Sequence, residues 1–155
     1  MTCFSDAIAQ KKNSTIVLTD EVKLTGEIEK FNAAKHRIDT CTNEFANKYI
    51  CRIDGRKWYG SDQGLELPRN QLNKLKIYIN NKPVVLNVSQ MFNPRYGYEL
   101  NSEHFKVIRK KSVYYLYGFF SDGAGTYTAH WKIYNGKSSR LKISNDEKDF
   151  AWQTN

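Results

Sequence analysis

The segment VYYLYGFF (113–120), followed by TYTAHWKIY (126–134), decides the fold class of this chain. In the first segment both alternate sets of side chains are apolar, which predicts a central strand covered on both faces. In the second segment apolar side chains hold the odd positions and more polar ones the even positions, which predicts one buried and one wet face. The predicted buried set is Tyr127, Ala129, Trp131 and Ile133.

The connections around these strands predict their register. A two-residue turn at Asn135-Gly136 would direct the later apolar residues Leu141 and Ile143 toward solvent. We therefore expect a three-residue loop over 134–136, with Gly136 left-handed in a G1 bulge. The same scheme applied to residues 121–125 predicts an aromatic ladder of core pairs. The predicted pairs are Phe119 with Tyr127, Tyr117 with Ala129 and Tyr115 with Trp131.

Alternation elsewhere predicts more strands and little helix. Strands are expected over 14–19 and 21–31, and in two hairpins that turn at Asp54-Gly55 and at Asn80-Asn81. The count comes to about eight to ten strands. The predicted fold class is therefore mainly β: a single-domain antiparallel β-sandwich, or a bent sheet closing toward a barrel.

The Asn80-Asn81 hairpin predicts one edge of a sheet. A two-residue turn pairs Ile77 with Val84, so the two apolar side chains share a face. Pro83 then lies opposite Tyr78 and cannot donate to the ladder, which places this end of the hairpin at an edge.

The region between the predicted second and third strands is harder to assign. Residues 32–48 show no strand alternation, and we interpret them as a polar excursion anchored to the core by Phe45. A type I′ turn at Asp54-Gly55 would put Ile50 opposite Tyr59 in the hairpin that follows.

Length favours one domain, 1–155, since a chain of 155 residues buries about two thirds of its unfolded surface. Residues 1–12 are interpreted as an N-terminal appendage with a short helix capped by Ser5. Residues 145–155 are expected to be a tail that docks through Phe150 and Trp152.

The three cysteines leave two alternatives open. Cys41 and Cys51 flank a loop that a disulfide would close onto the following strand, with Cys3 left over. The other interpretation is three reduced, buried thiols.

Composition bounds the partners and the compartment. The net charge of +8 favours an acidic partner: a protein, a nucleic acid or an anionic envelope surface. No run of 18 apolar residues is present, so we expect no spanning helix. The β-rich, Asn-, Thr-, Tyr- and Lys-rich composition favours an exported bacterial protein, periplasmic or secreted with its signal peptide removed; the alternative is the cytoplasm.

Motifs for catalysis are not visible in the sequence. The histidines His36, His104 and His130 lack metal-ligand spacing, and a G-x-S-x-G nucleophile motif is missing. We therefore expect no metal and no cofactor. An enzyme without a recognisable motif stays an alternative.

The leading hypothesis is a non-enzymatic binding protein that recognises another protein, of the inhibitor or toxin-immunity type. The candidate surface is the loop MFNPRYGYELN (91–101), whose Phe92, Arg95, Tyr96 and Tyr98 are of the types that anchor interfaces. Equally, these rings would cap the open end of the core.

The second hypothesis is a nucleic-acid-binding β module. The predicted wet face of the sheet combines rings with basic side chains, as single-stranded nucleic-acid platforms do. The residues of this alternative face are Tyr114, His130, Lys132, Arg140 and Lys142.

Overall fold

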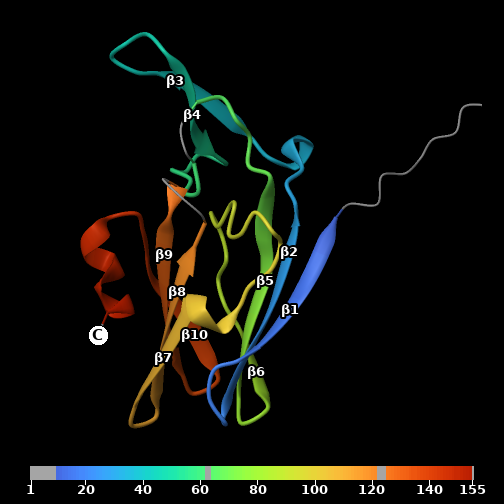
Figure 1. Cartoon of the computed structure of the whole chain (residues 1–155), viewed down its shortest axis with the longest axis vertical. Helices are drawn as coiled ribbons and strands as arrows, with labels where there is room; N and C mark the ends of the chain where they lie inside the picture. Colours follow the sequence, from blue (N-terminus) through green and yellow to red (C-terminus); the bar gives the residue numbers. More distant parts are fainter. Residues whose placement is uncertain (1–9, 62–63, 122–124, 155) are drawn as a thin grey trace, which may run out of the picture.

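The computed structural model describes residues 10–61, 64–121 and 125–154. Within these ranges ten strands form three antiparallel sheets, and short 3-10 helices connect some of them (Figure 1). The fold class is mainly β with little helix, as predicted, and no sheet of the described chain closes into a barrel.

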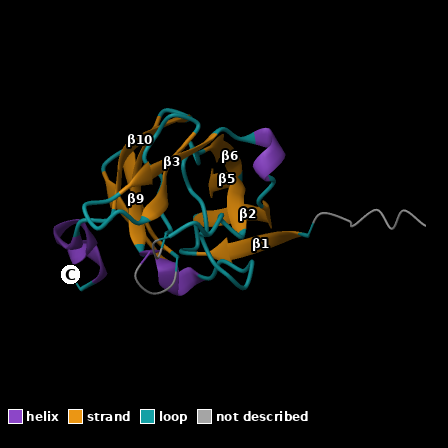
Figure 2. Ribbon diagram, turned by 90° about the horizontal axis from the view of Figure 1, so that it is seen from above, coloured by secondary structure: helices purple, strands orange, loops and turns teal. Residues whose placement is uncertain are grey.

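The two large sheets have simple orders. The first is β1-β2-β5-β6, built from β1 (Lys11–Val17), β2 (Val22–Lys30), β5 (Asn70–Ile79) and β6 (Lys82–Val85). The second is the meander β10-β9-β8-β7, built from β7 (Phe105–Lys110), β8 (Val113–Phe120), β9 (Tyr127–Tyr134) and β10 (Lys137–Ser144). Figure 2 shows these sheets as separate layers.

One core lies between these two sheets. Leu24, Leu75 and Ile77 of the first sheet and Leu116 and Trp131 of the second are fully buried in the same cluster. Both sheets therefore bury one face against the other, which is a β-sandwich.

The predicted register between β8 and β9 is wrong by one residue. Phe120 pairs with Tyr127 and Leu116 with Trp131, so the even-numbered side chains of β8 enter the core. The odd-numbered set, including Tyr117, is only half-buried on the outer face. Because both sets are apolar, periodicity alone did not distinguish them.

The predicted three-residue loop before β10 is also wrong. Lys137 pairs with Tyr134, which leaves a two-residue turn with φ of 52° at Asn135 and 72° at Gly136. A bulge between Arg140 and Lys142 then changes the facing of the strand. Leu141 is 57% exposed as a result, and Ile143 packs on the core.

The Asn80-Asn81 hairpin is confirmed. Ile77 pairs with Val84 and Pro83 with Tyr78, and β6 is an edge strand of its sheet. The sequence pattern predicts the first strand of this hairpin over 74–79, whereas β5 begins four residues earlier, at Asn70.

The excursion over 32–48 contains a strand that the sequence did not reveal. After η1 (Ala33–Lys35), β3 (Ile38–Thr42) pairs with β4 (Lys48–Ile53) as a separate two-stranded sheet. The Asp54-Gly55 turn forms, with φ of 55° and 76°, but only the Ile53–Arg56 bridge follows it. The predicted opposition of Ile50 and Tyr59 is therefore wrong.

The chain ends differ from each other. Lys11 and Lys12 belong to β1, and the rest of the predicted N-terminal helix, up to residue 9, lies outside the described residues. At the other end, η4 (Glu147–Gln153) packs on the second sheet through Phe150 and Trp152.

The turn geometry predicts the effect of a glycine substitution. Gly136→Ala should lower the free energy of unfolding by about 1 kcal/mol, because φ is +72° there and a Cβ is disfavoured in this region. Gly97→Ala is the matched control, since Gly97 has open space around it and no positive φ. Urea denaturation of both variants checks this; equal stabilities would contradict the turn assignment.

Candidate functional site

The β3–β4 hairpin and the segment after it form a small unit, residues 33–61, that we call the head. A second apolar cluster lies at its base, where Ile50, Ile53 and Trp58 of the head pack with Phe31 and Phe92 from outside it. Figure 1 shows the hairpin extending past the end of the two large sheets. The hairpin therefore projects from the sandwich, whereas the rest of the head packs on it, with Tyr59 against the main core.

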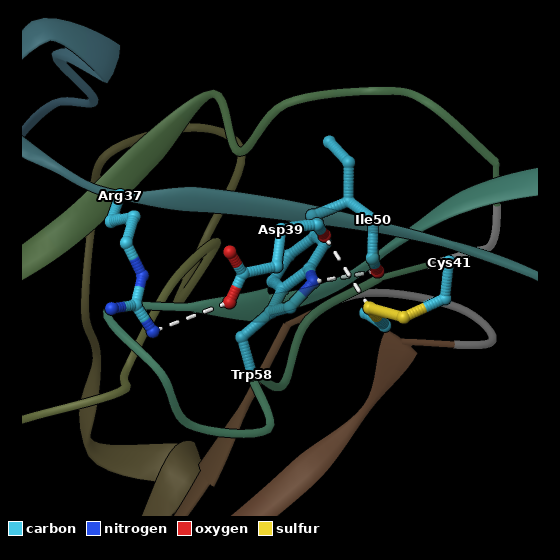
Figure 3. Close-up of a disulfide and its surroundings, with 6 residues drawn as sticks. Arg37, Asp39, Cys41, Ile50 and Trp58 are labelled. Atoms are coloured by element: carbon cyan, nitrogen blue, oxygen red, sulfur yellow. Dashed lines mark hydrogen bonds and ion pairs between the residues drawn. A yellow bond between two sulfur atoms is a disulfide. The ribbon is translucent and has the colours of Figure 1, made fainter.

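A disulfide between Cys41 and Cys51 joins the two strands of the head, with the Cα atoms 5.7 Å apart. Beside it, the indole N–H of Trp58 donates to the carbonyl of Ile50 at 3.1 Å (Figure 3). The covalent bond and the buried indole both fix β4, so the hairpin is a rigid projection rather than a loose loop.

The tip of the hairpin is also ordered by hydrogen bonds. The Asn43 side chain accepts from the backbone N–H groups of Phe45 and Asn47, at 2.9 and 3.0 Å. Phe45 is 75% exposed at this tip, so the prediction that it anchors the excursion to the core is wrong. A fixed, exposed phenyl ring is instead available to a partner.

A polar network joins the head to the first sheet. The Asp54 carboxylate accepts a hydrogen bond from Nδ1 of His36 at 2.7 Å. The side-chain amide oxygen of Gln71 lies 3.1 Å from Nε2 of the same ring. The Gln71 amide donates to Glu29, which directs its carbonyl oxygen at His36. Both ring nitrogens of His36 therefore lie within hydrogen-bond distance of a side-chain oxygen, one from the head and one from the first sheet.

The charge of Asp54 is stabilised in this network. The hydrogen bond from His36 is the largest cause that lowers the pKa of Asp54, and the backbone N–H of Arg37 adds a second donor. His36 also stacks on Phe31, with ring centroids 4.8 Å apart. The base of the head is thus fixed by both polar and aromatic contacts.

A groove of about 740 Å³ lies beside β4. Tyr49, Trp58 and Tyr59 contribute rings to its wall, and Lys48 and Lys57 contribute basic groups. The Lys57 ammonium lies 5.2 Å from the centre of the Tyr59 ring. Such a surface suits a ligand with both apolar and acidic groups.

The structure places the four predicted protein-binding residues in two environments. Phe92 and Arg95 are buried, with 6% and 8% exposure, so neither is presented to a partner. Tyr96 is half-buried beneath the guanidinium of Arg69, and Tyr98 packs against the main core. The loop thus caps the core, which was the other interpretation of these rings.

Arg95 has a clear internal role. Its guanidinium donates to the carbonyls of Phe119 and Ser121, at 3.0 and 3.3 Å, at the end of β8. Its own carbonyl accepts from the Asn70 amide at 2.7 Å. Arg95 therefore ties the 91–101 loop to both large sheets.

The five residues predicted to form the alternative basic face do not all lie on the same face of the sheet. Tyr114 is in the core, and Arg140 reaches Ser89 and Gln90 beside the other sheet. His130, Lys132 and Lys142 do share the outer face of the second sheet. Burial, followed by the charge of Lys142, lowers the pKa of His130.

The head was missed at the sequence level, although a signal for it exists. Cys41 and Cys51 flank the Asn43–Asn47 segment, a spacing that a disulfide-clamped hairpin with an asparagine-capped turn would need. The sequence analysis predicted that a Cys41–Cys51 disulfide would close a loop onto one strand. It therefore did not predict strand β3 or the exposed tip between β3 and β4.

Burial of Arg95 predicts a loss of stability rather than a loss of binding. Arg95→Ala should lower the free energy of unfolding by about 2–3 kcal/mol, since it leaves buried carbonyls without donors. Tyr96→Ala, which truncates a half-buried ring on the same loop, is the control and should cost less. Thermal or urea denaturation distinguishes them, and an Arg95→Ala protein as stable as wild type would contradict this role.

The disulfide predicts a second stability effect. Replacing both Cys41 and Cys51 by serine should destabilise the fold by about 3 kcal/mol, the entropy of closing a loop of this length. Cys3→Ser is the control and should be neutral. Non-reducing mass analysis should also show Cys41 linked to Cys51; two alkylatable thiols at these positions would refute the linkage.

Comparisons with protein-family models, curated proteins and solved structures find no match to this chain. The described residues contain no cluster of three or more His, Cys, Asp or Glu side chains placed to hold a metal ion. They also contain no helix with the length and apolar character needed to cross a membrane. Function must therefore be inferred from the head and from the surfaces of the sheets.

Proposed function

We propose that this is a non-enzymatic binding protein that recognises another protein through the head, with Phe45 as the central anchor. The observation that carries the proposal is the 75% exposure of Phe45 at a tip fixed by Asn43 and by the nearby disulfide. An exposed phenyl ring on a rigid support loses little conformational entropy on binding, and aromatic anchors dominate interface energies.

Three further exposed apolar side chains lie close to Phe45 in the sequence. Tyr49, Leu65 and Leu67 are 37%, 58% and 45% exposed, and they lie on β4 and on the segment that follows the head. Scattered exposed apolar residues are ordinary, so these side chains support the proposal only as additions to the Phe45 anchor.

Charge near the head favours an acidic partner. Lys48, Arg52, Arg56 and Lys57 are all exposed. Within the described ranges none of them has a carboxylate oxygen within 4.0 Å. Basic side chains around an apolar anchor steer an acidic surface toward it and add specificity.

The disulfide supports the proposed compartment. Disulfides persist in oxidising environments and are rare in the cytosol, so the Cys41–Cys51 bond supports a periplasmic or secreted protein. A small, exported binding protein with one rigid hairpin fits an inhibitor or immunity role, which is part of this proposal.

The test is affinity capture from the native organism with the wild-type protein as bait, followed by the same capture with variants. Phe45→Ala should weaken binding of the captured partner by about 30-fold, corresponding to about 2 kcal/mol. Val85→Ala is the matched control, because Val85 is 66% exposed on β6, outside the head. Unchanged binding of Phe45→Ala, or equal loss in both variants, would refute recognition by the head.

A further inference from the structure

The four strands of the second sheet contain no acidic residue. β7 to β10 read FKVIRK, VYYLYGFF, YTAHWKIY and KSSRLKIS, which include seven Lys or Arg side chains. The first sheet differs, because β2 carries Glu27 and Glu29 among its lysines. The strands of the first sheet also carry seven lysines, so what distinguishes the second sheet is that its strands have no carboxylate among their basic residues.

Strand register places five lysines on the outer face of this sheet, together with rings. Arg109 and Arg140 turn aside, to Glu21 and to the 89–90 segment. The lysines that share the outer face are Lys106, Lys110, Lys132, Lys137 and Lys142. Tyr115, Tyr117, Phe119, His130 and Tyr134 lie between them.

The C-terminal segment covers part of this face with complementary chemistry. Asp149 accepts from the Lys142 ammonium at 2.6 Å. The Trp152 ring lies over Tyr117, with centroids 5.8 Å apart and planes inclined by 30°, and Phe150 meets Phe119 edge-on. The segment thus brings one carboxylate to a lysine of the sheet and two rings to rings of the sheet.

The cover is light. No residue of η4 is buried, and Phe150 and Trp152 remain half-buried. Its other contacts with the sheet include the Trp152 indole donating to Thr128 at 3.0 Å and Lys106 donating to the Trp152 carbonyl at 3.3 Å. Few buried contacts imply a low local free energy of opening.

We propose that the outer face of the second sheet binds single-stranded nucleic acid, and that the acidic, aromatic segment 146–153 occupies the same surface in its absence. A nucleic-acid strand repeats the two groups that the segment provides, a negative charge and a flat ring, along its whole length. Lysines track its phosphates, and the tyrosine rings stack with its bases.

The uncovered part of the face favours a polyanion over a short peptide. Lys110 lies 5.7 Å from the Tyr115 ring centre, beyond the segment. Lys132, Tyr134 and Lys137 line a shallow hollow of about 420 Å³ at the end of β9 and β10. Within the described chain, Lys110, Lys132 and Lys137 have no carboxylate oxygen within 4.0 Å. The basic and aromatic surface therefore extends across all four strands.

The experiment is fluorescence anisotropy with a labelled oligothymidylate at a series of salt concentrations. Wild-type affinity should fall as salt rises, and the Lys110→Ala/Lys132→Ala variant should show a log–log slope smaller by about 1.4, or 0.7 for each lost phosphate contact. The matched control is Lys23→Ala/Lys76→Ala on the outer face of the first sheet, which removes the same charge and should leave the slope unchanged.

Release of the segment is the second arm. The Phe150→Ala/Trp152→Ala variant should bind the oligonucleotide more tightly, by about tenfold if the covered form outweighs the open form tenfold. Asp149→Asn, which frees Lys142 without removing a ring, should act in the same direction. Thermal denaturation of each variant shows that the fold is retained.

Three results would overturn the proposal. The first is the absence of salt-dependent oligonucleotide binding by both wild type and the segment-released variant. The second is an equal change of slope in the Lys23/Lys76 control. The third is displacement by polyglutamate as effective as displacement by unlabelled oligonucleotide, which would assign the face to acidic proteins. Phe45→Ala should leave the oligonucleotide titration unchanged, so this inference and the proposed function fail separately.

Discussion

The burial of two amphipathic rings, Tyr127 and Trp131, between the sheets is the constraint on which the rest of the structure depends. Each ring is fully buried and therefore needs an acceptor for its polar group. The Tyr127 hydroxyl donates to the Phe92 carbonyl at 3.0 Å, and the Trp131 indole donates to the Asn87 carbonyl at 2.9 Å. Both acceptors belong to the connection between β6 and η2 (Ser102–His104). This connection is consequently held against the core, and Phe92 is positioned beneath the head.

Strand alternation was enough to predict the fold class, and it failed where two different causes make a residue apolar. On the odd-numbered side of β8, Tyr117 and Phe119 contact the C-terminal segment, whereas the even-numbered side chains face the other sheet. Both causes give the same period of two in the sequence. The period therefore did not show which set of side chains faces the core, and the register was predicted wrongly. The bulge between Arg140 and Lys142 likewise made the predicted loop before β10 wrong. It shifts the register within the strand, so Ile143 faces the core although the turn has only two residues.

The candidate site could not be located from residue types alone. Tyr, Phe and Arg in a Pro- and Gly-containing loop fit an interface and a core cap equally well. What distinguishes them is the demand for donors at nearby backbone carbonyls, and Arg95 meets that demand at Phe119 and Ser121. Phe45 is the opposite case: its neighbour Asn43 satisfies the local backbone of the tip, so the ring itself has no structural task there.

The two outer faces of the sandwich carry their charge in different ways. On the first sheet, Glu27 pairs with Lys11 at 3.1 Å, so a carboxylate of the same sheet neutralises part of its positive charge, and Glu29 accepts from the neutral amide of Gln71. On the second sheet the strands supply only cations, and the carboxylates that meet them come from outside the sheet: Asp149 pairs with Lys142, and Glu21 pairs with Arg109. Like charges on one face raise the local potential, which persists beyond the surface because no carboxylate of the sheet cancels it. A face of this kind is stabilised by contact with an anionic group from outside the sheet. In this chain one such group is the Asp149 carboxylate of the C-terminal segment.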